Sequence, residues 1–401
     1  MTSDVAWLPF AGLKVLDISQ GIAGPYCAQI LWQQGADVIK VEPPDGDWGR
    51  HVGVVRQGQS ALSVCYNAGK RGVCIDARTA EGRRALRILA EQADVIVQNF
   101  RPGAAERMGV GHESLRAQRP ELVYVSISGY GADGPSSNAP ASDSVMQADS
   151  GLMFSNQNES GEPTRVGILL ADIATGLYAA QACSAALYRR AMTGQGMHVS
   201  LSLFEACAAL QANDMTAHAI AGARPVGAVS APNRVFATAD GRLSVLALNN
   251  DQFARLCRAM DRQSWLEDER FADNAARMAH REVLHAELAA QFATQPSDYW
   301  VARLAQEQVL HAPVRDYQQV AAHPQARHLG LFDTLDQPGV GVVPVVAAPG
   351  LGGRRAPEVA PAIGAHTDLI LQQAGVDADQ IQAWHDAGVI VQEGRDARVA
   401  M

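Results

Sequence analysis

The sequence predicts an α/β protein built on a doubly wound parallel sheet, with a second, smaller α/β domain. Three observations support this prediction. Short apolar runs alternate with helix-like segments over the first half of the chain, which favours parallel pairing of the strands. The length of 401 residues is enough for two domains. After a Gly- and Pro-rich bend at 222–233, the pattern changes from alternating strands and helices to a hairpin followed by charged helices.

The strands expected in the parallel sheet are short apolar runs, most of them followed by Gly, Asn or Pro. They cover 14–17, 36–42, 71–75, 94–97 and 122–127, with an alternating run at 197–203. Helices are expected from 23 through 32, over the amphipathic stretch 79–92, and after Asp172. Ligands of such sheets bind in loops at the carboxyl ends of the strands, here 19–25, 99–108 and 128–134.

The predicted domains are a large Rossmann-like domain over 1–224, a smaller α/β domain over 225–325, and a return to the large domain over 326–401. The run 235–243 is expected to form a hairpin with Asp240-Gly241 as its turn. Charged helices should follow from 251 to about 309, and closing helices at 367–374 and 377–387. The Gly-, Pro- and Val-rich stretch 338–361 is expected to be irregular or to form an edge.

Composition narrows the class of protein. Lys and Arg number 33 against 42 Asp and Glu, with no basic tract, so we expect no nucleic-acid partner and no anionic membrane. The six cysteines lack C-x-x-C spacing, which favours buried reduced thiols and a cytoplasmic location. We also see no signal-peptide pattern and no uncharged run of membrane-spanning length.

Several familiar sites are not predicted. There is no G-x-G-x-x-G at a strand-to-helix turn and no G-x-x-x-x-G-K-[ST], so nucleotide-binding loops of those kinds are not expected. The sequence has no G-x-S-x-G elbow. The histidines show no H-E-x-x-H, and we expect no metal.

Asp172 is the carboxylate that the surrounding pattern singles out. It follows the apolar run 167–171 and precedes a helix pattern rich in Gly and Ala, which leads to a turn at 193–196 and the run 197–203. An Asp at such a junction is well suited to cap the helix. From these residues alone, a capping role and a chemical role both stay open.

A second group combines cations with apolar side chains on predicted loops. Lys70, Arg71, Arg101 and Arg107 accompany Phe100 and Met108. Loop cations suit phosphate oxygens, and Arg offers a bidentate fork. Phe100 and Met108 could hold a flat base by apolar contact. The alternative is a set of solvated surface charges.

The strings that carry these residues together resemble the family III CoA-transferases from Leu13 to Thr367. They are D-x-x-x-G with its small-residue helix, R-x-x-T-G-x-G, V-S-L-S-L-F-E, N-F-R-P-G-x-x-x-R-M-G and S-I-S-G-Y-G-A-D-G-P. The resemblance implies that Asp172 is a nucleophile. It implies a CoA site formed by Lys70, Asn99, Phe100, Arg107 and Met108, beside which we also expect Arg71 and Arg101. Near the thioester it places Gln20, Ile22, Gly129, Tyr130 and Gly131.

The same resemblance implies the reaction and its partners. A CoA thioester and a small carboxylic acid would be substrates, no cofactor would be tightly bound, and two chains would form an interlocked homodimer. Asp172 would carry anhydride and CoA-thioester intermediates, with backbone amides of 129–131 or those after Asp172 as oxyanion donors. Formyl-CoA transferases have His and Gln at the positions of Gln20 and Ile22, and a glycine-rich lid where this chain has 248–251 without glycine. These departures disfavour formyl and oxalate as substrates. The resemblance implies succinyl-CoA or another small acyl-CoA as the donor, because many members of the family use succinyl-CoA.

Two alternatives accompany the transferase. A racemase of 2-methylacyl-CoA with the same fold adds a His in a G-H-D motif, where this chain has Ala141-Ser142-Asp143. A hydroxyl cannot cycle a proton near neutral pH as an imidazole can, so the transferase is favoured. The other alternative is a catalytically silent CoA-binding protein.

Overall fold

The computed structural model of the chain describes residues 7–158, 160–222, 229–350 and 355–393. The chain divides into two compact units, one formed by 1–215 with 331–401 and the other by 216–330. The predicted limits of the smaller domain, 225 and 325, lie nine and five residues inside the limits of the second unit.

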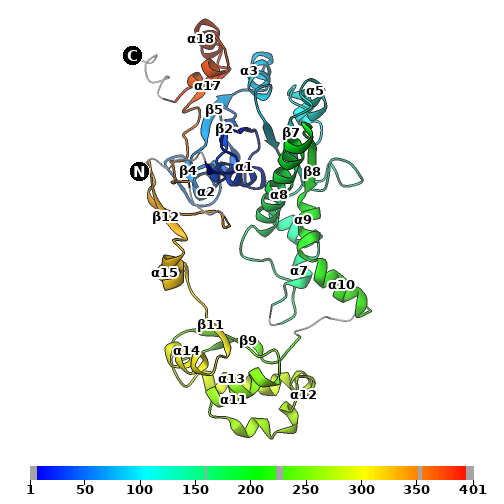
Figure 1. The fold of residues 1–401 in the computed structure, drawn as a ribbon, viewed down its shortest axis with the longest axis vertical. Helices are drawn as coiled ribbons and strands as arrows, with labels where there is room; N and C mark the ends of the chain where they lie inside the picture. The colour runs from blue at the N-terminus through cyan, green and yellow to red at the C-terminus, as the bar shows by residue number, and fades with distance from the viewer. Residues whose placement is uncertain (1–6, 159, 223–228, 351–354, 394–401) are drawn as a thin grey trace. The chain divides into compact units, whose positions relative to one another are not determined.

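A seven-stranded sheet forms the centre of the first unit, in the order β14-β5-β2-β1-β6-β7-β8 (Figure 1). Its strands β5, β2, β1, β6, β7 and β8 pair in parallel, and β14 pairs antiparallel with β5. The predicted α/β class with a largely parallel sheet is confirmed. The strands are β1 (Lys14–Asp17), β2 (Asp37–Glu42), β5 (Arg71–Ile75), β6 (Val95–Gln98), β7 (Val123–Ser128), β8 (His198–Ser202) and β14 (Ile390–Val391).

Chain order reverses between β1 and its neighbour β6, so the loops that leave these two strands go to opposite faces of the sheet. In register, Lys14 lies opposite Asp37 of β2, and Val15 lies opposite Val95 of β6. Ligands of open α/β sheets bind at such a switch point, outside the carboxyl ends of the strands.

Helices cover both faces of the sheet, which explains why its strands are nearly continuous apolar runs. One core packs against α1 (Ala23–Gln33), α6 (Asp143–Asp149), α7 (Leu152–Ser155), α8 (Leu170–Thr193) and α9 (Leu203–Leu210). The other packs against α3 (Ala80–Ala90), α5 (His112–Gln118), α17 (Thr367–Gln373) and α18 (Ala378–Asp386). The first unit also holds α2 (Ala61–Asn67), α4 (Ala104–Arg107), and the short strands β3 (Val55–Arg56) and β4 (Gln59–Ser60).

The small residues of α8 allow it to approach α1 closely. A Cβ added to Gly176 would lie 2.9 Å from the carbonyl oxygen of Ala23 and 2.9 Å from Cδ1 of Tyr26. Ala179 and Ala180 are buried in the same contact region. The helix ends at Gly194, whose φ of +70° is the left-handed conformation that commonly closes helices.

The stretch 338–361 was predicted to be irregular or to form an edge, and part of it is an edge strand of a two-stranded sheet. Strand β13 (Gly341–Val346) pairs antiparallel with β12 (Phe332–Gln337), and Gly339 in the turn has a φ of +76°. The alternation of β13 was masked in the sequence by the Gly and Pro residues around it.

The second unit contains a three-stranded sheet in the order β11-β10-β9. The predicted hairpin is confirmed, with Asp240-Gly241 between β9 (Asn233–Ala237) and β10 (Arg242–Leu246). β11 (Leu310–Pro313) completes the sheet. The helix α10 (Ala212–Ile220) begins in the first unit and continues into the second. The other helices of the second unit are α11 (Asn250–Ala259), α12 (Asn274–Ala279), α13 (Arg281–Phe292), α14 (Ser297–Gln306), α15 (Tyr317–Ala322) and α16 (Pro324–His328). The segment 248–251 begins α11, where the Asn249 side chain accepts a hydrogen bond from the amide of Gln252.

A search of the described residues finds no helix with the length and apolar character needed to span a bilayer.

Candidate active site and ligand pocket

A pocket of about 390 Å³ lies at the carboxyl ends of four neighbouring strands, β5, β2, β1 and β6. Its apolar walls include Ile18, Val41, Ile75, Leu86, Phe100 and Met108. Its cations are Arg78, Arg83 and Arg107. Apolar walls with a few cations suit a nucleotide that carries phosphates. Arg107 is exposed and forms no ion pair or hydrogen bond with the residues described, so its guanidinium is free to bind an anion.

The pocket brings together part of the predicted CoA site. Gln20, Phe100, Arg107 and Met108 line it. Asn99 lies behind the lining: its Oδ1 accepts the amide of Gln20 at 2.8 Å, and its Nδ2 donates to the carbonyl of Gln20 at 2.6 Å. Asn99 therefore ties the loop after β6 to the loop after β1 across the switch point.

Sequence reasoning missed two of the pocket's arginines. Arg78 follows β5 and forms an ion pair with Asp76 at 2.7 Å, and Arg83 lies on α3 and donates to the carbonyl of Arg78 at 2.7 Å. The signal was available, since the segment 76–79 follows the carboxyl end of a predicted strand. Arg78 and Arg83 were not predicted because they belong to no recognisable sequence motif.

Lys70 does not line this pocket, which corrects the prediction that it contacts CoA. Its ammonium is buried and donates to Asp17 Oδ2 at 2.7 Å, to the carbonyl of Pro25 at 2.9 Å and to Asn67 Oδ1 at 3.0 Å. These partners use all three of its N–H groups. Burial lowers the pKa of Lys70 to about 8, although the charge of Asp17 opposes the shift.

A buried network next to Lys70 holds the first loop, 18–22, in place through the carboxylate of Asp47. Asp47 Oδ1 accepts the amides of Gly21 and Gly49, each at 2.8 Å, and its Oδ2 accepts from Lys40 at 2.9 Å. Gly21 has a φ of +78°, and a Cβ there would lie 1.9 Å from the ring of Trp48. Glycine is therefore required at this position both by the backbone conformation and by the ring above it.

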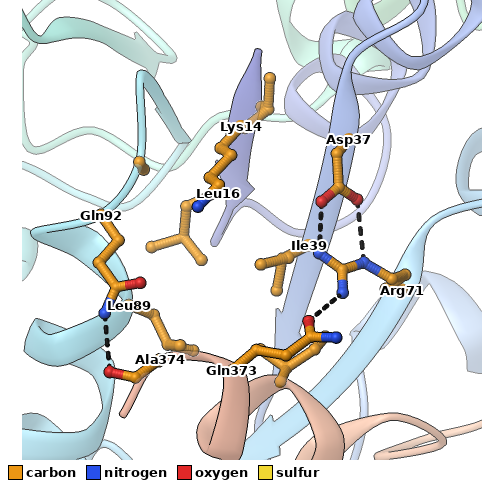
Figure 2. A pocket seen from close by; sticks show the side chains of 12 residues that line it. Lys14, Leu16, Asp37, Ile39, Arg71, Leu89, Gln92, Gln373 and Ala374 are labelled. Carbon is orange, nitrogen blue, oxygen red and sulfur yellow. Dashed lines mark hydrogen bonds and ion pairs between the residues drawn. The ribbon is translucent and has the colours of Figure 1, made fainter. Parts of the chain in front are cut away.

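Arg71 and Arg101 also lie away from the pocket. Arg71 lies at the amino end of β5, away from the pocket at its carboxyl end. Its guanidinium pairs with Asp37 and donates to Gln373 Oε1 at 2.8 Å (Figure 2). Arg101 is exposed and lines a different hollow of about 170 Å³ with His112 and His198. Lys70 and Arg71 lie at the amino end of β5, whereas the pocket is at the carboxyl ends of the strands, so these two residues do not join the predicted cluster.

Asp172 is the third residue of α8 and does not cap it, so the capping alternative is wrong. The N-cap is Leu169, and the free amides of the first turn are met from α6. Asp143 Oδ2 accepts the amide of Ala171 at 2.8 Å and that of Asp172 at 3.4 Å. The other oxygen of Asp143 accepts from Gln147 Nε2 at 2.7 Å. The buried pair Asp143 and Gln147 thus anchors the start of α8.

The carboxylate of Asp172 is partly buried and accepts no hydrogen bond from the described residues. Burial, and second the charge of Asp143, raise its pKa from 3.8 to about 7. A helix N-terminus favours a carboxylate by only about 0.3–1 kcal/mol, less than one pKa unit. Burial therefore outweighs the helix N-terminus, and the pKa of Asp172 is raised well above that of a free carboxyl group.

Asp172 lies close to the first loop. One turn further along α8, Gly176 is packed against Ala23, the first residue of α1, and Ile22 immediately before it is buried. Tyr66 lies near enough for the Asp172 charge to contribute to its raised pKa, which is caused mainly by burial. The loop after β1 thus runs from Gln20 at the pocket to Ala23, which packs against α8 one turn beyond Asp172.

One amide of the loop 129–131 is already used within the loop. Gly131 donates its amide to Ser128 Oγ at 3.0 Å, and Tyr130 donates its hydroxyl to Asp149 Oδ2 at 2.8 Å. Near Asp172, the amide of Ile173 donates to the carbonyl of Leu169, as those of Ala171 and Asp172 do to Asp143. Of the predicted oxyanion donors, the amides of Gly129 and Tyr130 make no hydrogen bond with the described residues.

Neither a metal cluster nor disulfides are found in the described parts of the chain. No group of three or more His, Cys, Asp or Glu could hold a metal ion there. All six cysteines are free, and five are buried, whereas Cys65 is exposed.

Comparison with known proteins gives consistent matches. The family described as CoA-transferase family III matches residues 10–367. A succinate–glutarate CoA-transferase of Agrobacterium fabrum is 32% identical, covering 91% of this chain and 95% of its own. An acetyl-CoA:oxalate CoA-transferase of Acetobacter aceti is 34% identical, covering 79% and 83%. The crystal structure of a CaiB/BaiF family protein from Brucella suis matches with a TM-score of 0.83 at 33% identity, covering 91% and 99%.

Proposed function

The chain belongs to CoA-transferase family III, and we propose that it moves CoA from a small acyl-CoA to a carboxylic acid through covalent intermediates on Asp172. The single observation that carries the proposal is the position of Asp172. Its partly buried carboxylate lies at the start of α8, beside the loop whose other end lines the phosphate-compatible pocket.

The chemistry proceeds in two balanced halves. Ionised Asp172 attacks the thioester carbonyl, and the C–S bond breaks to give an aspartyl-acyl anhydride and CoA thiolate. The thiolate attacks the Asp172 carbonyl and expels the donor acid, leaving an aspartyl-CoA thioester. The acceptor carboxylate then attacks this thioester and frees the thiolate, which attacks the acceptor's acyl carbon. Asp172 leaves as a carboxylate, and the acceptor leaves as its CoA thioester.

The environment of Asp172 suits a nucleophile that must also be a leaving group. No hydrogen bond from the described residues stabilises its carboxylate, and Asp143 adds a like charge nearby. Both effects raise the free energy of the resting carboxylate relative to the covalent intermediates, in which Asp172 is neutral. With a pKa of about 7, activity should rise with pH through neutrality as Asp172 ionises.

Arg107 and Gln20 would bind different parts of the acyl-CoA. Arg107, free and exposed at the pocket, binds phosphate oxygens of CoA, while Phe100 and Met108 contact its base. Gln20 lines the pocket with its backbone held by Asn99, and its loop leads to Ala23, which packs against α8. Its side chain is therefore placed to contact the acyl end. The CoA thioester is a substrate in this scheme, and no resident cofactor takes part.

Succinyl-CoA is the donor that we propose. The name of the Agrobacterium relative contains succinate and glutarate. We therefore propose a small dicarboxylate such as glutarate as the acceptor. The Acetobacter relative is named for acetyl-CoA and oxalate, so these substrates provide the direct comparison. Gln20 and Ile22 replace the residues expected of a formyl-CoA transferase, which supports the longer acids.

A racemase is the competing function, and one observation favours it. A carboxyl group with a pKa of about 7 is well matched to proton transfer. Racemisation, however, needs a second acid–base group, and Ser142 at the relevant position is an exposed hydroxyl. Exchange of solvent deuterium into the α-carbon of a 2-methylacyl-CoA, without CoA transfer, would establish the racemase.

The assembly that we propose is a homodimer, interlocked as the family resemblance implies. Its support here is the exposed stripe Leu177, Tyr188 and Met192 on α8, whose exposed fractions are 48%, 70% and 68%. Apolar side chains repeating along one helix face are commonly covered by a partner. Light scattering should give twice the mass of one chain. The six free cysteines suit a reducing compartment, which supports the cytoplasm.

Trapping of the covalent intermediate tests the proposed function. The protein is mixed briefly with succinyl-CoA, digested, and analysed by mass spectrometry. We expect a CoA adduct on the peptide that holds Asp172, converted to a hydroxamate by hydroxylamine. Asp172→Ala should lose the adduct and the transfer while still binding CoA. Binding of CoA without any adduct in the native chain would instead support a silent CoA-binding protein.

A further inference from the structure

A second pocket, of about 300 Å³, opens at the amino ends of β1, β2 and β5 (Figure 2). It lies at the opposite end of these strands from the site that contains Gln20 and Arg107. The ends of α3 and α17 close its sides through Gln92, Ala93, Gln373 and Ala374. None of its lining residues has a role in the transfer proposed above.

The floor of this amino-edge pocket is apolar. Leu16 and Ile39 project from the sheet, and Leu89 and Ile370 face them from α3 and α17. Figure 2 shows Leu16, Ile39 and Leu89 between the polar groups at the rim. Its volume is at the lower limit of typical small-molecule sites, about 300–1,000 Å³. The floor therefore suits a short apolar body.

The rim of the pocket carries more positive than negative charge. Asp37 is paired with Arg71, and the next acidic side chain, Asp94, is paired with Arg190 at 3.1 Å. The ammonium of Lys14 is exposed and forms no hydrogen bond or ion pair with the described residues. In Figure 2 its side chain extends toward the apolar floor. One unit of positive charge is thus left without a partner.

Hydrogen-bond donors remain beside that charge. Arg71 uses one N–H each from Nε, Nη1 and Nη2 for Asp37 and Gln373, so each terminal nitrogen keeps one. Gln373 accepts with Oε1, and its Nε2 makes no bond within the described residues. Gln92 donates to the carbonyl of Ala374 at 2.9 Å, which fixes that side of the rim.

Lys14 is also unusual within this chain. The sequence has three lysines, and the other two, Lys40 and Lys70, are buried in the network below the first loop. Every other basic side chain apart from histidine is an arginine. The one exposed lysine therefore lies at the rim of a pocket.

We propose that the amino-edge pocket is a second ligand site, which binds a monocarboxylate with a short aliphatic body. The carboxylate contacts the Lys14 ammonium, the aliphatic body covers Leu16, Ile39, Leu89 and Ile370, and the spare donors of Arg71 and Gln373 lie at the far rim. One negative charge balances the one unpaired cation. A doubly charged phosphate would leave a negative charge beside Asp37 and has no use for the apolar floor.

Lys14 has one simpler role. The carbonyl ends of α3 and α17 carry partial negative charge, which a nearby cation stabilises. That role requires no ligand, so it predicts no saturable binding of an anion at Lys14. The experiment below separates the two roles.

Because Lys14 is the exposed lysine, it can be observed directly. Reductive methylation with carbon-13 formaldehyde labels it while keeping its positive charge. Hexanoate is then titrated into the labelled full-length protein, and the methyl signal is followed by NMR. We expect a saturable shift of that signal, and a much weaker effect of neutral hexanamide at the same concentrations. A shift that stays linear in hexanoate, or an equal response to hexanamide, would overturn the proposal.

Calorimetry with matched variants gives the second test. Lys14→Gln should weaken hexanoate binding by about tenfold or more, in line with the loss of one charge-assisted hydrogen bond. Arg84→Gln removes an exposed cation from α3 outside the pocket and should leave the affinity unchanged. If both variants weakened hexanoate binding equally, the effect would come from general surface charge, which would contradict a specific site at Lys14. Binding that persists in Asp172→Ala places the ligand outside the transfer site, so this proposal and the proposed function can fail separately.

Discussion

Replacing Asp172 with Asn should make the folded protein less sensitive to pH. The pKa of Asp172 rises from 3.8 to about 7 on folding, chiefly through burial. Because the folded chain holds this proton more tightly than the unfolded chain, stability from Asp172 is full below pH 3.8 and is lost as pH rises through about 7. The neutral amide of Asn has no such dependence.

The shift of roughly three pKa units corresponds to an upper limit of about 4 kcal/mol. Solvent screening of a partly exposed side chain reduces this, and we expect about 2–4 kcal/mol. The free energy of unfolding of Asp172→Asn, minus that of the native protein, should therefore be near zero at pH 4 and should grow to this value at pH 8.

Urea unfolding of both proteins at matched pH measures the difference, and the subtraction cancels groups common to both. Asp379→Asn, an exposed carboxylate at the start of α18 in the same unit, is the control and should give a nearly flat difference. A difference for Asp172→Asn that is independent of pH, or largest in acid, would refute the assignment of burial as the cause.

The other predictions concern the pocket, the first loop and the helix contact. Arg107→Ala should weaken CoA binding by about tenfold in calorimetry and leave the KM for the acid unchanged, because it removes a phosphate contact only; unchanged CoA affinity would make Arg107 a solvated surface charge. Asn99→Ala removes both bonds to the Gln20 backbone, and kcat should fall by about 10–100-fold through loss of positioning; a normal kcat would show that the loop holds itself. Gly176→Val places a side chain against Ala23 and should destabilise the fold by about 1–3 kcal/mol in thermal unfolding, whereas the exposed Ala185→Val should cost little; equal effects of the two would contradict the close α1–α8 contact.

The sequence pattern predicted the fold well for strands and helices whose own residues indicate their structure. The runs at 14–17 and 71–75 are the strands β1 and β5 without adjustment, because buried parallel strands are short apolar segments with clear ends. The region of β13 was predicted only as irregular or edge structure, because its pairing with β12 cannot be read from the composition of one strand.

The site was predictable in kind and only partly in detail. Phe100, Arg107 and Met108 line one pocket because they follow the carboxyl end of β6. Lys70 and Arg71 were misplaced because their fates depend on distant partners, Asp17 and Asp37, that sequence spacing does not reveal. The role of Asp143 at the start of α8 was likewise hidden, since it links two helices through backbone amides.

Transfer of oxygen to Asp172 is the most direct test of the central claim. The protein turns over succinyl-CoA with glutarate whose carboxylates are labelled with oxygen-18. It is then digested, and the mass of the peptide that holds Asp172 is measured by mass spectrometry. If each turnover passes through anhydrides on Asp172, one acceptor oxygen remains on its carboxylate, and the peptide becomes heavier. Turnover that leaves this peptide unlabelled would contradict covalent catalysis by Asp172.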